Sequence, residues 1–99
     1  MDLREKIKTN VSELCDEFGI TKLAIFGSVA RGEESSESDI DFFAEFELAT
    51  PETMPDRYFG FIEAASRMFG RTVQVVTPRM LRNPHFIKAI ERDLVTVHE

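Results

Sequence analysis

The sequence has no tryptophan, a single cysteine and no long apolar run in its 99 residues. With Cys15 alone, an intramolecular disulfide is excluded, which agrees with the reducing cytoplasm as the expected location. Cys15 itself is expected to be a half-buried helix residue. The first residues, 1–6, are charged and lack the apolar segment of a signal peptide. No stretch approaches the ~18 apolar residues of a membrane span, so no membrane partner is expected.

Basic residues are scarce as well, with 12 Lys and Arg against 18 Asp and Glu and a net charge of −6. Nine of the acidic residues lie between Glu33 and Asp56, a stretch without Lys or Arg. Such a surface repels a phosphate backbone, so direct nucleic-acid binding is not expected. Two interpretations stay open: a surface for a basic protein partner, or the ordinary solubility of a small acidic domain.

What is present is typical of one small folded domain spanning 1–99, with 42% hydrophobic and 30% charged residues. The hydrophobic periodicity predicts helices alternating with strands, and therefore an α/β fold with a small mixed β-sheet and helices packed on it. We expect strands over 23–26, 40–46 and 72–76, and a short strand over 95–97. The expected helices are one over 3–18, a helical turn after Ser28, one opened by Pro51 and Pro55 and ended by Gly70, and one capped by Asn83.

The strand expected over 40–46 has two different faces. Read at period two, the face with Ile40 and Phe42 is apolar and should meet the core, whereas Asp39 and Asp41 lie on the opposite face. Two carboxylates roughly 6.5–7 Å apart at their Cα atoms can converge on one divalent cation. Oxygen ligands favour Mg²⁺ over zinc. Solvated acids on an edge strand are the alternative interpretation. Glu45 shares this face, but we expect it to be an exposed charge at the far end of the strand.

A second feature precedes the acidic pair, where an apolar run ends in Gly27-Ser28. A strand that enters a small-residue turn and a helix start presents backbone N–H groups to an anion, and glycine permits close approach. Arg31 is the only Lys or Arg between Lys22 and Arg57; it can bind phosphate or pair with a neighbouring glutamate. Phosphate groups on one side and a metal on the other predict a nucleoside triphosphate as ligand.

The chain carries Gly27-Ser28, then ten intervening residues, and then Asp39-Ile40-Asp41. This pattern resembles the motif of the polymerase-β nucleotidyltransferase superfamily. At this length the chain is most similar to the minimal nucleotidyltransferases (MNT), the antitoxins of HEPN/MNT toxin–antitoxin pairs. The resemblance implies a polymerase-β-like core and ATP as substrate. Asp39 and Asp41 are then the catalytic residues and Mg²⁺ ligands, and Gly27, Ser28 and Arg31 bind the nucleotide. The resemblance also implies that the partner in a hetero-oligomer is a HEPN ribonuclease toxin, and that transfer of AMP to a tyrosine of this toxin silences it.

One position departs from the pattern of that superfamily. The resemblance implies a third carboxylate, which helps hold the metal and deprotonate the attacking hydroxyl, where this chain has Gln74. An amide is no useful base at neutral pH, although its oxygen can accept a hydrogen bond. Two functions therefore stay open: a protein adenylyltransferase, or a weakened nucleotidyltransferase fold that neutralises its partner by binding alone.

Overall fold

The computed structural model describes residues 2–47, 50 and 52–99. In chain order the elements are α1 (Leu3–Asn10), α2 (Ser12–Phe18), β1 (Ile20–Phe26), α3 (Gly27–Arg31), β2 (Ile40–Phe46), α4 (Met54–Phe69), β3 (Val73–Val76), the 3-10 helix η1 (Pro78–Met80), α5 (Pro84–Asp93) and β4 (Val95–His98). The structure describes no helix long and apolar enough to cross a membrane.

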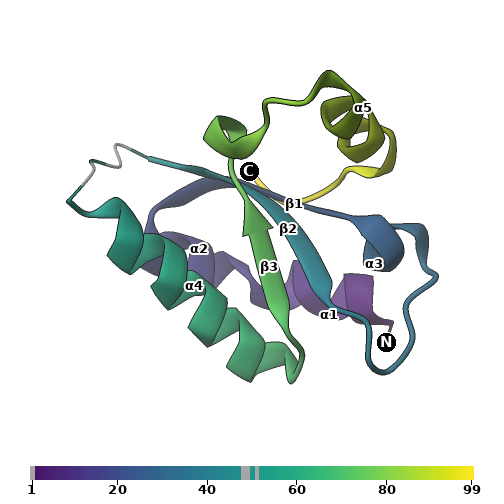
Figure 1. Cartoon of the computed structure of the whole chain (residues 1–99). Coiled ribbons are helices and arrows are strands. Elements are labelled where there is room, and N and C mark those ends of the chain that lie inside the picture. Colours follow the sequence, from purple (N-terminus) through teal and green to yellow (C-terminus); the bar gives the residue numbers. More distant parts are fainter. Residues whose placement is uncertain (1, 48–49, 51) are drawn as a thin grey trace.

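The strands form one mixed sheet in the order β3-β2-β1-β4. β1 is antiparallel to both β2 and β4, whereas β2 and β3 are parallel. In Figure 1, α2 and α4 lie on one side of this sheet and α5 lies on the other. The predicted α/β class with a small mixed sheet and helices packed on it is confirmed.

The main core lies between the sheet and the helices α1, α2 and α4. Phe42 of β2 is fully buried and its ring meets that of Phe61 of α4 edge to face, with centroids 5.5 Å apart. A buried aromatic side chain contributes about 1.5–3 kcal/mol, so this contact strongly favours one face of β2 inside. The opposite face of β2 is thereby turned away from the core, and this face carries Asp41.

The predicted strand over 40–46 matches β2 residue for residue, and Asn83 caps α5 by accepting a hydrogen bond from the His85 N–H at 2.9 Å. The single helix expected over 3–18 is wrong in detail, because it bends at Val11 into α1 and α2. Helical hydrogen bonding still passes through this residue, since the Val11 N–H donates to the Ile7 carbonyl at 3.1 Å.

Three further expectations differ from the structure or lie outside it. β1 begins at Ile20 rather than at position 23, because an irregular pairing with β2 recruits Ile20 opposite Phe46. Cys15, expected to be half-buried, is fully buried in the core. Pro51 lies outside the described residues, while Pro55 occupies the first turn of α4 as expected.

Candidate active site

The acidic pair lies where β2 begins, next to the end of β1. Asp41 is the cross-strand partner of Phe26 on one side and of Gln74 on the other. Burial alternates along β2, with Ile40 and Phe42 buried and Asp41 partly exposed. Asp39 directly precedes the strand and is also partly exposed. The pleat of β2 thus keeps Asp41 accessible while its neighbours hold the strand in the core.

The glycine of the Gly27-Ser28 turn touches the acidic pair directly. Gly27 directly follows β1 and begins α3 with a φ of +74°, a conformation that favours glycine. A Cβ atom built on Gly27 would lie 2.6 Å from Oδ2 of Asp41. The turn and the carboxylate therefore share one small space, and this space requires glycine. Ser28 follows and remains partly exposed beside it.

The electrostatics of this corner favour a cation. Burial raises the pKa of Asp41, the nearby charge of Asp39 raises it further, and Arg31 lowers it. Two carboxylates that repel each other gain from a bound divalent ion. Among the residues that the structure describes, no third His, Cys, Asp or Glu joins them as a metal cluster. One or two carboxylates completed by substrate phosphates are the usual protein contribution to Mg²⁺, so the residues present fit this ion.

Gln74 is the residue for which the superfamily resemblance predicts a third carboxylate. It is opposite Asp41 in the parallel pairing of β2 with β3. Its side-chain amide Nε2 donates a hydrogen bond to Oδ2 of Asp39 at 3.2 Å. Where the superfamily pattern has a third negative charge, this chain thus has a neutral donor that orients Asp39.

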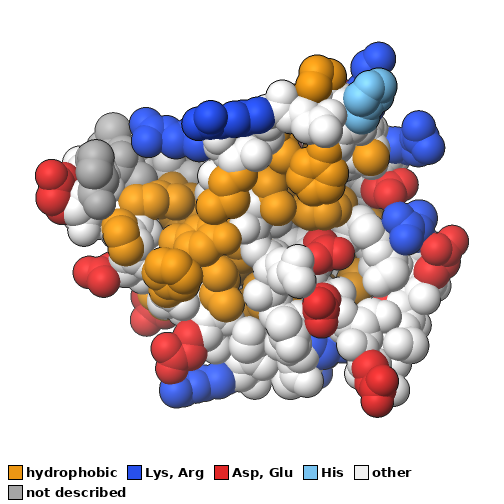
Figure 2. All heavy atoms as spheres, viewed as in Figure 1, with side chains coloured by type: hydrophobic (Ala, Val, Ile, Leu, Met, Phe, Trp, Pro, Cys, Tyr) orange, Lys and Arg blue, Asp and Glu red, His pale blue; other side chains and the backbone are white. Residues whose placement is uncertain are grey.

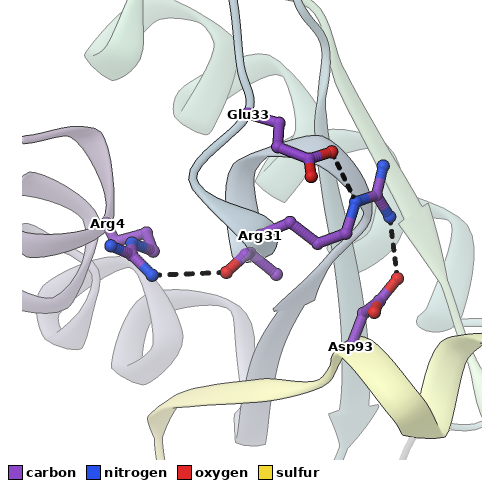
Figure 3. A network of polar contacts seen from close by, with 5 residues as sticks. Arg4, Arg31, Glu33 and Asp93 are labelled. Carbon is purple, nitrogen blue, oxygen red and sulfur yellow. Dashed lines mark hydrogen bonds and ion pairs between the residues drawn. The ribbon is translucent and has the colours of Figure 1, made fainter.

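Arg31 lies at the end of α3 between two carboxylates (Figure 3). Its Nε donates to Glu33 at 2.9 Å and its Nη1 to Asp93 at 2.8 Å. The expected surface pair with a neighbouring glutamate is thus present. The second partner, 62 positions away at the end of α5, has no signal in the sequence.

A second residue missed by the sequence motifs is Arg71. Its Nη1 donates to the carbonyls of Ser35 at 2.8 Å and Ser38 at 3.0 Å. These carbonyls belong to the loop that leads into Asp39, so Arg71 anchors this loop just before the acidic pair. Its place between α4 and β3 gives no local hint of this contact.

Glu45 does not join the acidic pair. It faces Lys22 across the strands, four residues beyond Asp41, or roughly 13 Å along β2. There it lines an open groove of about 780 Å³, whose other described walls are Ala44, Phe46, Thr50, Met54, Pro55, Tyr58, Phe59, Thr77, Pro78, Arg79 and Met80. Figure 2 shows hydrophobic side chains gathered where α4 begins and β3 ends. None of the predicted site residues lines this groove, so chemistry and not cavity size locates the site.

Comparison with known proteins agrees with the motif and the fold. Residues 6–97 match the nucleotidyltransferase domain family. The chain is 33% identical over 96 residues to a candidate protein adenylyltransferase of Methanocaldococcus jannaschii, a match that covers 97% of this chain and 95% of that protein. Among solved structures, a candidate minimal nucleotidyltransferase is similar with a TM-score of 0.75 and 29% identity, covering 96% of this chain and 95% of the other.

A more distant likeness concerns the fold alone. It is to a chain of the complex between the tri-AMPylated Shewanella oneidensis HEPN toxin and its MNT antitoxin, with a TM-score of 0.60 and 11% identity. The similarity covers 96% of this chain and 71% of that chain. Since one family matches almost the whole chain and close relatives share its length, this chain belongs to the nucleotidyltransferase domain family and is a nucleotidyltransferase.

Proposed function

We propose that this nucleotidyltransferase transfers AMP from ATP to a tyrosine hydroxyl of a HEPN ribonuclease toxin and thereby acts as its antitoxin. The contact between the Gly27 turn and the Asp41 carboxylate carries the proposal, because it joins an anion-binding turn to a cation-binding acid. The protein adenylyltransferase relatives support AMP as the transferred group. The toxin-bound antitoxin of similar fold supports the partner.

Each site residue then has one task. The Gly27-Ser28 turn binds the phosphate chain through backbone N–H groups and the Ser28 hydroxyl. Asp39 and Asp41 hold Mg²⁺, and the Arg31 guanidinium approaches the phosphates from the end of α3. A Mg²⁺ ion held by these two carboxylates would supply electrostatic stabilisation of the charge that develops on the leaving group.

The reaction is an in-line displacement at the α-phosphorus of ATP. The acceptor oxygen forms a new O–P bond as the bond to pyrophosphate breaks, and the hydroxyl proton passes to a site carboxylate or to water. Positioning and electrostatic stabilisation supply most of the rate in such transfers. In the proposed reaction the partner protein presents the acceptor tyrosine to the α-phosphorus.

We propose that Gln74 limits the rate of AMP transfer at this site. Its amide orients Asp39 but accepts no proton at neutral pH. General-base assistance is worth about 10²–10⁴-fold, so transfer should be slow and not absent. The contact between Gln74 and Asp39 also favours a second candidate function, a partner-binding antitoxin whose transferase site has weakened.

Mass spectrometry of the partner distinguishes these functions. The purified protein is incubated with its co-expressed HEPN partner, ATP and Mg²⁺, and the partner is then weighed. We expect added AMP with wild type, none with Asp41→Asn, and faster addition with Gln74→Asp. Glu45→Gln is the matched control, since it removes a carboxylate from the same face of β2 outside the site. Addition by Gln74→Asp but not by wild type supports the binding-only antitoxin.

A further inference from the structure

Arg31 is held by carboxylates from two different segments of the chain (Figure 3). Glu33 belongs to the loop before Asp39, and Asp93 is the last residue of α5. The guanidinium therefore links α3, the acidic loop and α5 at one point beside the acidic pair. The backbone of α3 is held separately, because Nη1 of Arg4 donates to the Ala30 carbonyl at 3.4 Å.

The two partners of Arg31 differ in how firmly they are placed. The Asp93 side chain is 21% exposed, whereas the Glu33 side chain is 65% exposed. Exposed ion pairs are screened by solvent and exchange readily. Asp93 also lies on a helix that Ile90, which is buried, fixes against the rest of the fold. Asp93 is therefore the more rigid of the two carboxylates.

This arrangement leaves part of the guanidinium free to bind. Arginine has five N–H donors, and the two hydrogen bonds use one on Nε and one on Nη1. The remaining donors of the planar group can meet phosphate oxygens while the first two stay engaged. Arg31 is the last residue of the same short helix α3 that begins with Gly27, so Arg31 and the Gly27-Ser28 turn belong to one element.

We propose that Asp93 is a positioning residue, which holds the Arg31 guanidinium in place for the triphosphate so that binding does not have to order this side chain. The proposal rests on the proposed function and deepens it, because it makes α5 part of nucleotide recognition. It assigns no contact between Asp93 and the substrate.

The expected effect of Asp93 is on affinity rather than on the chemical step. Ordering one long side chain on binding corresponds to about three- to tenfold in affinity. We expect Asp93→Asn to raise the Kd and KM for ATP·Mg²⁺ by this factor and to leave kcat within about twofold. Asp93→Glu, which keeps the charge, should recover part of the affinity.

A double-mutant cycle with Arg31→Ala tests the proposal by calorimetric titration of ATP·Mg²⁺ and by initial rates of AMP transfer. If Asp93 acts through Arg31, Asp93→Asn has no further effect in the Arg31→Ala background. Glu91→Gln is the matched control, as it removes a charge from the exposed side of the same helix. Thermal melts verify that each variant is folded.

Two outcomes overturn the proposal: an unchanged or lower Kd in Asp93→Asn, or an equal loss of affinity with and without Arg31. The binding data separate this failure from that of the proposed function. A wild type that binds ATP and obeys the cycle without transferring AMP supports the role of Asp93 and contradicts the transferase. A wild type that transfers AMP but shows no coupling between Asp93 and Arg31 supports the transferase and contradicts the role of Asp93. A wild type that binds no ATP contradicts both.

Discussion

Gly27 is the residue at which the Gly27-Ser28 turn meets Asp41 of the acidic pair. Its positive φ and the absence of a Cβ are both needed, because Oδ2 of Asp41 occupies the space where a Cβ would lie. Gly70 has a similar φ of +63°, but nothing lies within 4 Å of its Cβ position. A substitution at Gly70 therefore introduces backbone strain alone, whereas a substitution at Gly27 introduces both strain and a steric clash with Asp41.

We expect Gly27→Ala to lower AMP transfer by about 10²-fold, because the added methyl displaces the Asp41 carboxylate by a distance that catalysis does not tolerate. Gly70→Ala is the control and should cost about 1 kcal/mol of stability from strain alone, with activity retained. Urea unfolding and transfer rates measure the two effects. Equal activity losses in both variants would show that strain, and not the position of Asp41, is responsible.

Cys15 is a core residue with a pH-dependent contribution to stability. Burial, with a smaller effect of Asp16, raises the pKa of its thiol to about 12, against 9.0 in an unfolded chain. Below pH 9 neither state loses the proton, so the full stability is present. Between about pH 9 and 12 the unfolded chain ionises and the native protein does not, so stability falls as pH rises.

We therefore expect the urea midpoint of wild type to decline more steeply between pH 8 and 10.5 than that of Cys15→Ala. Other groups that ionise in this range are common to both proteins and cancel in the comparison. Parallel declines would mean that the thiol ionises as easily in the folded as in the unfolded chain.

At the scale of elements, β2 is the part of the fold that organises the site. Its inner face is fixed by Phe42 against α4, and its outer face carries Asp41 opposite Gln74 of β3. The loop that enters β2 has no regular structure and depends on Arg71 for its anchorage. The position of Asp39 thus depends on a contact outside the strand.

We expect Arg71→Ala to weaken ATP·Mg²⁺ binding several-fold and to cost about 1 kcal/mol, since two hydrogen bonds to loop carbonyls are lost. Arg67→Ala is the matched control; its exposed pair with Glu63 along α4 is worth at most about 0.5 kcal/mol. Calorimetry and thermal melts compare the two variants. An unchanged affinity in Arg71→Ala would show that Asp39 holds its position without the anchored loop.

Across the whole molecule, the acidic stretch of the sequence does not form one patch. The loop with Glu33 lies at the beginning of β2, whereas Glu47 and Asp56 lie beyond its end, roughly 20 Å away. Figure 2 shows Asp and Glu distributed around the visible face and not gathered on one side. A single acidic surface for a basic partner is therefore not supported by the run of charge alone.

We expect the negative charge around the site to make nucleotide binding depend on a divalent metal. At 100 times the Kd a ligand stabilises the native state by about 2.7 kcal/mol, which corresponds to a Tm increase of roughly 10 °C or more for a domain of this size. We expect this increase with ATP and Mg²⁺, and little or none with ATP and EDTA or with Asp41→Asn. A shift of equal size in EDTA would show that the phosphates bind without a cation.

Local patterns predicted a large part of this protein. Period-two alternation predicted the bounds and the faces of β2, because side chains of a strand alternate whatever surrounds it. A breaker at Gly70 predicted the end of α4, and the cap at Asn83 predicted the start of α5, for the same local reason. The bend at Val11 and the extra residues of β1 were missed, since they arise from packing and irregular strand pairing.

The sequence by itself determined the family, the face of β2 that carries Asp41 and the Gly27-Ser28 turn, since spacing and periodicity are properties of neighbouring residues. Only the tertiary structure decided that Gln74 donates to Asp39, 35 positions away, and that Asp93 holds Arg31 across 62 positions. Contacts over such separations depend on how strands pair and helices pack, and no local pattern encodes them.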